Sequence, residues 1–429
     1  MYKSIKLIVL VLMALFMFSC NDSKKENKKE TEKEQPIVNA KDILGNSEYL
    51  AISYGGYRQK DRNIQPTIPE LKEDMKILSA MGIKMLRTYN VHFDQAANLL
   101  KAIDELKKED SKFEMYVMLG IWIDCKSAFN WENGEPNHKE ESKRNTVEVK
   151  TAVELAKQYP DIVKVLAVGN EAMVKWATSY FVEPWIILKW VNHLQDLKQN
   201  GELSKDLWIT SSDDYSSWGG GDAIYHTEDL EKLAHAVDYI SMHTYAYHNS
   251  HYNPGFWKVP ENEESLSDKE KIDAAMLRAL DFAKVQYDSV SNYMKSIGVN
   301  KPIHIGETGW ASVSGGHYGN NGSRATDEYK QGLYHKHMRA WTEKENISCF
   351  YFEAFDEQWK DGQNPLGSEN HFGLINLQSE AKYPLWSLVD DGTFDGLTRD
   401  GKPITKTYNG NLEELMKDVL VPNTDYPRD

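Results

Sequence analysis

Two glutamates in this chain each close a short apolar run that is typical of a buried strand. Glu171 ends residues 165–171, Val-Leu-Ala-Val-Gly-Asn-Glu, and Glu307 lies within residues 302–310, Pro-Ile-His-Ile-Gly-Glu-Thr-Gly-Trp. Two carboxyl groups delivered by different strands can break a glycosidic bond together, one as the acid and the other as nucleophile or base. Either glutamate alone could equally be a helix cap at a strand end or half of a buried ion pair.

The elements that would bring these glutamates together follow from the hydrophobic pattern, which alternates strand and helix along the chain. Short apolar runs predict eight strands, at residues 49–57, 85–90, 114–123, 163–168, 207–211, 237–245, 302–307 and 348–355. Apolar residues at spacings of three and four predict helices at residues 68–81, 94–107, 146–158, 183–198, 227–234, 268–296 and 326–345. The alternation predicts the α/β class, a (β/α)8 TIM barrel that forms a single catalytic domain. Both glutamates would lie at the C-terminal ends of its strands.

Three connections that follow strands are long enough to carry function, because most connections in compact domains are shorter. They span residues 124–145, 213–226 and 247–267 and carry Trp131, Trp218 and Trp257 among Gly, Asn and Asp. Residues 311–324 are rich in Gly and Ser, and residues 371–421 should contain a closing helix and a wrap across the barrel.

The chain resembles glycoside hydrolase family 17, the β-1,3-glucanases, in six motifs that occur in the family's order. They are residues 52–57, 85–89, 168–171, 238–245, 306–310 and 352–360. Two departures concern substrate preference more than the reaction: Thr244 precedes Tyr245 where plant members have Tyr-Pro, and Ala311 follows Trp310 where they have Pro-Ser.

The resemblance implies a retaining, double-displacement reaction with an assigned task for each central residue. Glu171 would be the general acid and base, and Glu307 the nucleophile that forms a glycosyl-enzyme. Asn170 would bond the 2-hydroxyl of the sugar. Tyr245 would orient the carboxylate of Glu307, and Arg87 would keep it ionised.

Other residues are candidate substrate contacts rather than catalysts. The resemblance assigns the charged group after the eighth strand to support of the acid and of the subsite at the cleaved sugar: Glu353, Glu357 and Lys360. Aromatic side chains stack on the apolar faces of sugars, and the candidates for this are Trp122, Trp131, Trp310 and Trp359, with Tyr54 of the first strand as a further contact. For each tryptophan, packing in the core is the alternative. His243 is expected to be a hydrogen-bonded neighbour of the site rather than an acid.

Composition narrows the class of partner. A net charge of -15 argues against nucleic acid, and 12 Trp with 23 Tyr suit a neutral glucan. The histidines show no spacing typical of zinc ligands, and there is neither a phosphate-binding glycine loop nor a Gly-x-Ser-x-Gly elbow. We therefore expect a β-1,3-glucan polysaccharide or oligosaccharide as partner, no metal, no cofactor and a monomer.

The chain begins with a predicted export segment. Lys3 and Lys6 precede an apolar run that is short for a membrane span, and the run ends at Ser19-Cys20, which resembles a bacterial lipobox. We expect a signal peptide at residues 1–19, a lipid on Cys20, a disordered polar tether at 20–39, the barrel at 40–421 and a tail at 422–429. These features predict an exported outer-membrane or cell-surface lipoprotein of a Gram-negative bacterium. A plain signal peptide with an incidental cysteine is the alternative.

The two remaining cysteines are expected to be free thiols. Cys125 would follow the third strand and Cys349 would begin the eighth. Those are opposite ends of a parallel barrel, which exceeds the ~7 Å between Cα atoms that a disulfide can bridge.

Three functions remain open from the sequence. The leading hypothesis is a retaining β-1,3-glucanase that cuts laminarin-type glucans internally. The second is a β-1,3-glucanosyltransferase, in which a sugar instead of water accepts the glycosyl group. The third is a non-catalytic glycan-binding lipoprotein, which would have no need of both carboxyl groups.

Overall fold

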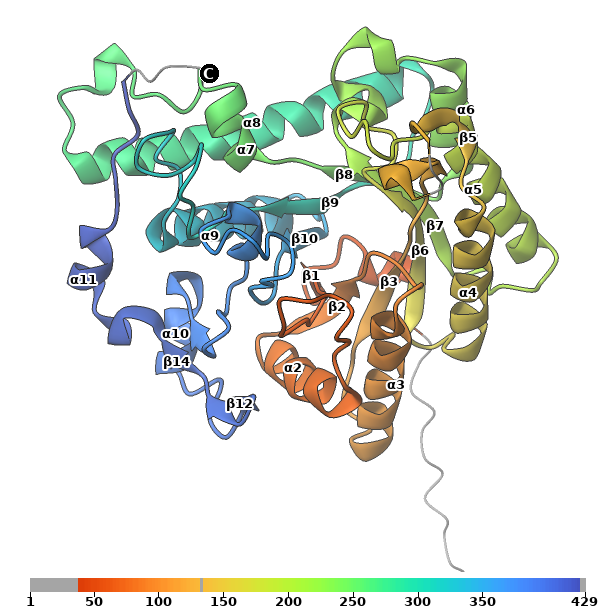
Figure 1. Ribbon diagram of the computed structural model, residues 1–429, viewed down its shortest axis with the longest axis horizontal. Coiled ribbons are helices and arrows are strands. Elements are labelled where there is room, and N and C mark those ends of the chain that lie inside the picture. Colours follow the sequence, from red (N-terminus) through yellow and green to blue (C-terminus); the bar gives the residue numbers. More distant parts are fainter. Residues whose placement is uncertain (1–37, 132–133, 425–429) are drawn as a thin grey trace, which may run out of the picture. The chain divides into compact units, whose positions relative to one another are not determined.

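The computed structural model describes residues 38–131 and 134–424. Within them, eight strands pair in parallel and close into a barrel in the order β1-β10-β9-β8-β7-β6-β3-β2, with helices outside it (Figure 1). The predicted (β/α)8 barrel is confirmed. The expected signal peptide, the expected lipid site at Cys20 and residues 20–37 of the expected tether lie outside the described residues.

All eight predicted strands are present, with ends that differ by a few residues. They are β1 Leu50–Ser53, β2 Ile83–Arg87, β3 Tyr116–Ile121, β6 Val163–Asn170, β7 Trp208–Asp214, β8 Ile240–His243, β9 Ile303–Gly309 and β10 Cys349–Phe352. β6 and β7 continue past their apolar runs because Asn170 pairs with Ser212 across the ladder. The polar residues that finish these strands are therefore held by the sheet at the edge where the candidate site lies.

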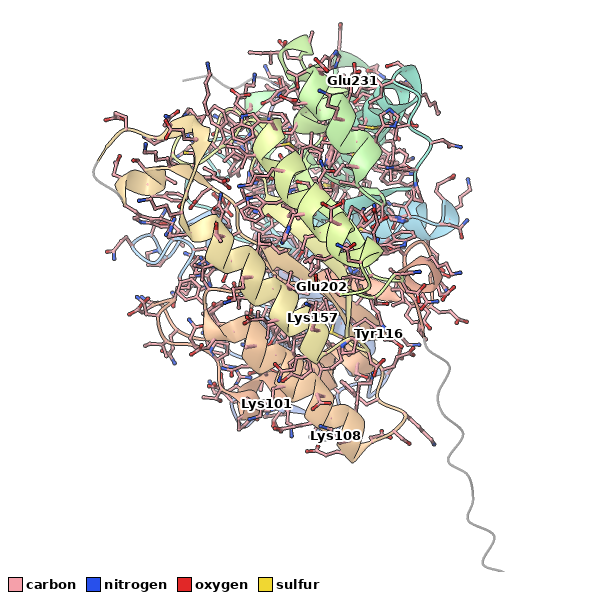
Figure 2. All side chains as sticks on the ribbon, turned by 90° about the vertical axis from the view of Figure 1, so that its right-hand side faces the viewer. Lys101, Lys108, Tyr116, Lys157, Glu202 and Glu231 are labelled. Atoms are coloured by element: carbon pink, nitrogen blue, oxygen red, sulfur yellow. The ribbon has the colours of Figure 1, made fainter. Side chains whose placement is uncertain are left out.

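The outer helices match the predicted amphipathic patterns. They are α2 Ile68–Ala80, α3 Asp94–Glu109, α4 Arg144–Gln158, α5 Pro184–Gln199, α6 Glu228–Ala236, α8 Asp268–Ser296 and α9 Glu328–Lys344. In α3, Leu99 and Ile103 are buried, whereas Lys101 and Lys108 project from the outer face (Figure 2). Each helix thus covers the barrel with one apolar stripe.

The long connections contain more structure than the sequence predicted. In the connection at 124–145, β4 Cys125–Lys126 pairs antiparallel with β5 Asn137–Glu141. The connection expected at 247–267 begins inside α7 Ala246–Tyr252. Trp218 and Trp257 are fully buried and donate to backbone carbonyls, of Ser241 at 2.9 Å and of Ser323 at 2.7 Å. These two tryptophans anchor their loops.

The C-terminal stretch wraps the barrel as expected, through α10 Trp386–Asp390 and α11 Leu412–Lys417. It also contains four two-residue strands, β11 Glu380–Ala381, β12 Thr398–Arg399, β13 Lys402–Pro403 and β14 Thr405–Lys406. The packed unit extends two residues beyond the predicted boundaries at both ends. Val38 packs on a core cluster before the short helix α1 Ala40–Ile43. Asn423 accepts from the backbone of Val259 and donates to that of Gly322.

Cys125 and Cys349 are both buried and free, as predicted. Among the residues described, no helix combines the length and the apolar character that a membrane span requires.

Candidate active site

The two glutamates lie at the same end of the barrel. Glu307 is part of β9, and Glu171 directly follows β6, so each ends a parallel strand on the C-terminal side. A side chain on Gly306 would lie 2.2 Å from the Ser241 hydroxyl, so only glycine permits this packing beside Glu307. Glu171 itself has φ 45°, in the left-handed region. Non-glycine residues are uncommon there and are found disproportionately at functional sites.

Both oxygens of the Glu307 carboxylate are held by donors. The Tyr245 hydroxyl donates to Oε1 at 2.6 Å, and the Tyr89 hydroxyl donates to Oε2 at 3.1 Å. Arg87 forms an ion pair with Oε2 and donates to the Gly306 carbonyl at 3.0 Å. This carboxylate is consequently fixed in orientation and faces a buried cation.

Asn170 is tied to the same arginine. Its Oδ1 accepts from Nη2 of Arg87, which leaves the amide nitrogen as the end available to a ligand hydroxyl. The structure thus brings together Asn170, Arg87, Tyr245, Glu171 and Glu307, all five of the central residues predicted from the sequence.

Glu171 has a different set of neighbours. Its Oε1 lies 3.0 Å from Nδ1 of His243, and Nε2 of that ring lies 2.8 Å from the Ser212 hydroxyl. Burial lowers the pKa of His243 to about 4, so the ring is neutral at pH 7. A neutral imidazole donates from one nitrogen and accepts at the other, and it therefore orients Glu171 without neutralising it. His243 occupies the neighbouring position predicted for it.

The pKa values of the two carboxyl groups are shifted in opposite directions. Burial, and after it the negative charge of Glu307, raises the pKa of Glu171 to about 8. Burial opposes ionisation of Glu307 too, but the Arg87 charge and the hydrogen bonds from Tyr245 and Arg87 outweigh it and lower the pKa to about 2. At neutral pH one group is a carboxylic acid and the other a carboxylate. A pair whose pKa values are pushed apart in this way can divide acid and nucleophile between its members.

The distance between the groups is short. One oxygen of Glu171, one oxygen of Glu307 and a nitrogen of His243 all lie within 4.8 Å of one another. Inverting glycosidases need ~6.5–9.5 Å between their carboxyl groups to admit a water, and retaining ones ~5–5.5 Å. The observed spacing falls on the retaining side.

One imidazole and two carboxylates could in principle bind a divalent cation. Here both oxygens of Glu307 already accept from Arg87, Tyr89 and Tyr245. A metal bound at that carboxylate would face the Arg87 guanidinium and would have to displace its donors. We therefore assign no metal to this cluster.

The second charged group predicted from the sequence is also assembled. Lys360 pairs with Glu353 at 2.5 Å and with Glu357 at 3.5 Å. Glu353 is buried, and burial raises its pKa well above the ordinary value. Glu357 accepts from the backbone of Tyr57 and from Nε1 of Trp359, both at 3.0 Å. Together these contacts fasten the segment after β10 to the one after β1.

Two predicted substrate contacts are wrong. Trp310 is fully buried, packs on Tyr247, Trp257 and Tyr334, and donates to the Ala325 carbonyl at 2.8 Å. Tyr54 is 1% exposed, and its hydroxyl donates to Asp74 at 3.0 Å. Neither ring can reach a bound sugar.

The other candidate tryptophans are accessible. Trp131 is 53% exposed, and Trp122 and Trp359 are partly exposed. The Arg62 guanidinium lies 4.1 Å from the ring centroid of Trp359 and covers part of that ring.

Two residues at the site were not assigned roles from the sequence. Tyr89 lies two residues beyond Arg87, the last residue of β2, and both donate to Glu307. That period-two spacing is the signal that could have identified it. Asp213 accepts from the backbone of Met173 at 2.8 Å and so holds the segment after Glu171. No local pattern marks this contact between β7 and the loop after β6.

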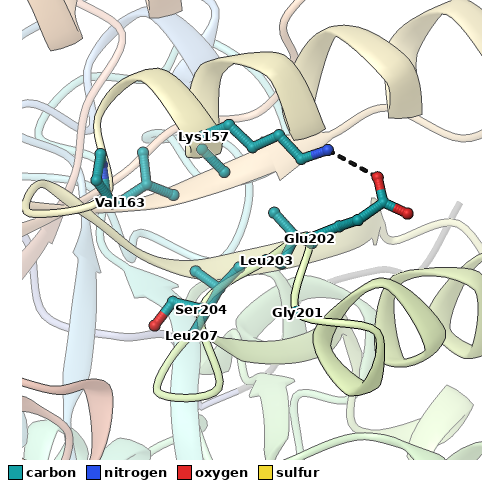
Figure 3. A pocket seen from close by; sticks show the side chains of 9 residues that line it. Lys157, Val163, Gly201, Glu202, Leu203, Ser204 and Leu207 are labelled. Carbon is teal, nitrogen blue, oxygen red and sulfur yellow. Dashed lines mark hydrogen bonds and ion pairs between the residues drawn. The ribbon is translucent and has the colours of Figure 1, made fainter.

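A hollow of about 210 Å³ lies at the other end of the strands, between α4 and the segment after α5 (Figure 3). It is lined by Val163, the first residue of β6, and by Leu207, which directly precedes β7. A Lys157–Glu202 ion pair spans it. Being at the N-terminal ends of the strands, it is separate from the glutamate pair.

Comparison with known proteins places the chain among carbohydrate-active enzymes. The BtgE/BtgC glycoside hydrolase domain matches residues 51–373. A glucan 1,3-beta-glucosidase of Arthroderma benhamiae is 24% identical over 327 residues, which cover 73% of this chain and 83% of that protein. The "Probable glucan endo-1,3-beta-glucosidase btgC" of Aspergillus fumigatus is 25% identical over 334 residues, 74% of this chain but only 40% of that protein.

Among solved structures, the chain is similar to an endo-laminarinase from Formosa Hel1_33_131. The two are 64% identical with a TM-score of 0.89, over 91% of this chain and 99% of that one. A glycoside hydrolase family 17 β-1,3-glucanosyltransferase from Rhizomucor miehei is 20% identical, with a TM-score of 0.53 over 79% of this chain and 97% of that one. At that identity, the second likeness shows the fold alone.

Proposed function

The chain belongs to the BtgE/BtgC glycoside hydrolase family, which confirms the resemblance to glycoside hydrolase family 17, and we propose that it is a retaining endo-β-1,3-glucanase acting on laminarin-type glucans. The mechanism rests on one observation: the pKa of Glu171 is raised and that of Glu307 is lowered, while an oxygen of each carboxyl group lies within 4.8 Å of the other. The 64% identity to an endo-laminarinase supports the substrate and internal cleavage.

In the first step the Glu307 carboxylate attacks the anomeric carbon of the bound glucan. The bond from that carbon to the glycosidic oxygen breaks, and the oxygen takes the proton of Glu171 as it leaves. Tyr245, Tyr89 and Arg87 keep the attacking oxygen ionised and directed. The amide nitrogen of Asn170 is placed to bond the 2-hydroxyl, a contact that strengthens toward the transition state.

In the second step a water attacks the anomeric carbon, gives its proton to Glu171 and releases Glu307 as carboxylate. Burial, the larger cause of the raised pKa of Glu171, persists in the glycosyl-enzyme, but the second cause, the negative charge of Glu307, disappears once Glu307 is esterified. The pKa of Glu171 therefore falls in the intermediate, which favours its change from acid to base. The same coupling restores the acid form after Glu307 is released.

The test is product analysis by chromatography after incubation with laminarin. Hydrolysis predicts only products shorter than the substrate, and internal cleavage predicts a spread of lengths from the first minutes. Products longer than the substrate would show a glucanosyltransferase, a single short product would show action from the chain end, and no products would show a binding protein.

For location, we propose an exported lipoprotein anchored through Cys20, with residues 1–19 as its signal peptide and a monomeric catalytic domain. The support is the apolar run that ends at Ser19-Cys20 and the polar segment that follows it. Membrane fractionation of the unmodified protein and of Cys20→Ala tests the anchor.

A further inference from the structure

We infer that four aromatic side chains beyond β3 and β6 form a sugar-stacking subsite for glucan units remote from the cleaved bond. This aromatic platform consists of Trp122, Phe129, Trp131 and Tyr180. The inference rests on the proposed function, because it takes the glucan that the glutamate pair cleaves as its ligand.

The rings form one continuous array built from two loops. Tyr180 lies 5.4 Å from Trp122 and 5.2 Å from Phe129, and Phe129 lies 4.7 Å from Trp131, all between ring centroids. Tyr180 and Phe129 are stacked at 22°. Trp122 to Trp131 come from the connection after β3, whereas Tyr180 comes from the segment after Glu171. The array therefore joins the segment after Glu171 to the connection after β3.

The connection after β3 exposes two of its aromatic rings to solvent. Phe129 is 39% and Trp131 is 53% exposed, so these rings are not packed as core. Ser127, Phe129 and Asn130 have φ of 60°, 52° and 60°. Left-handed backbone is an outlier for a bulky residue, persists only where surrounding contacts enforce it, and clusters at ligand sites. The loop is thus shaped to expose aromatic surface.

Polar contacts fix the array before any ligand arrives. The Arg144 guanidinium lies 3.4 Å from the ring centroid of Trp131 and pairs with Asp124 at 2.5 Å. Asp124 also accepts from Nε1 of Trp122 at 3.2 Å, and the backbone of Phe129 donates to the Ser179 carbonyl at 2.8 Å. Rings that are already immobile lose little entropy on binding.

The platform begins at the catalytic pair. The backbone of Val182 donates to the Ala172 carbonyl at 2.7 Å, which holds the chain two residues after Tyr180 against the residue that follows Glu171. Burial mainly, and then the charges of Glu171, Asp213 and Glu307, raise the pKa of Tyr180, in agreement with that position. From Tyr180 the array continues through Phe129 to exposed Trp131. A glucan held at Glu307 could thus extend along the rings, whose apolar faces suit the C–H faces of neutral sugars.

The experiment compares a long and a short substrate in the full-length enzyme. For Trp131→Ala, kcat/KM on laminarin should fall about tenfold further than kcat/KM on 4-nitrophenyl β-laminaribioside, the loss of one stacking contact. Trp131→Phe keeps a ring and should recover most of that loss. Trp185→Ala, at an exposed tryptophan in the first turn of α5, is the control and should change neither value.

Equal losses on both substrates, or no loss, would overturn the subsite, as would a Trp131→Phe variant as impaired as Trp131→Ala. If the unmodified protein cleaves neither substrate, the proposed reaction fails and binding decides the subsite separately. Laminarin should then quench tryptophan fluorescence of the unmodified protein and quench Trp131→Ala at about tenfold higher concentration. Identical titrations would reject the platform.

Discussion

The hydrogen bond from Tyr245 to Glu307 offers a quantitative test of how the nucleophile is held. Tyr245→Phe removes a 2.6 Å bond to Oε1 and leaves Arg87 and Tyr89 on Oε2. A hydrogen bond to a charged group contributes ~1.5–3 kcal/mol, and each pKa unit corresponds to about 1.4 kcal/mol. The pKa of Glu307 should therefore rise by ~1–2 units from about 2.

The assay is the pH dependence of kcat/KM on laminarin, whose limbs report the essential base and acid of the free enzyme. Glu307 must be ionised to attack, so Tyr245→Phe should move the acid limb upward by ~1–2 pH units. The basic limb, set by Glu171, should stay in place. Circular dichroism at each pH checks that the fold persists.

Tyr247→Phe is the matched control, since its hydroxyl bonds Thr326 at 2.9 Å and not the carboxylate. It should leave the acid limb in place. Were the acid limb of Tyr245→Phe to coincide with that of the unmodified enzyme, Tyr245 would not be setting the ionisation of Glu307. A shift of the basic limb alone would mean that Glu307 is the acid and Glu171 the nucleophile, the reverse of the proposed assignment.

Three further predictions concern stability and location. The raised pKa of Glu171 gives stability that is present below about pH 4.3 and is lost as the pH rises toward 8. Between those pH values Glu171→Gln, which stays uncharged, should gain roughly 2–4 kcal/mol in urea unfolding relative to the unmodified protein, and an equal stability difference between the two proteins at about pH 4.3 and at about pH 8 would contradict this. Trp310→Phe should lose ~1–3 kcal/mol of stability through its missing bond to Ala325, with KM unchanged; a raised KM at unchanged stability would restore Trp310 as a sugar contact. The Cys20→Ala variant should move from the membrane fraction to the soluble fraction and stay active, and its retention in the membrane fraction would reject the anchor.

The sequence predicted the barrel because its signals are local. Helix α8, for example, was predicted at both ends: Ser267 forms a capping box with Glu270, and Gly298 follows the last turn. The central site residues were also predictable, since parallel strands bring their C-terminal ends to one edge of the barrel.

Tyr54 and Trp310 could not be placed in this way, because an aromatic residue beside a motif can face the site or the core. Tyr54 faces inward toward Asp74, which is held by Arg58 and by Arg399 from the C-terminal wrap. A contact between residues 74 and 399 leaves no local pattern. The contact of His243 with Glu171 depends likewise on how two separate strands align.

The most direct test of the account is the configuration of the first product. NMR of laminarin hydrolysis, recorded before mutarotation, should show the new reducing end as the β-anomer, because two displacements at the anomeric carbon restore its configuration. A first product of α configuration would mean that water attacks directly. Glu307 would then be a base and not a nucleophile, in contradiction of the mechanism proposed for this pair.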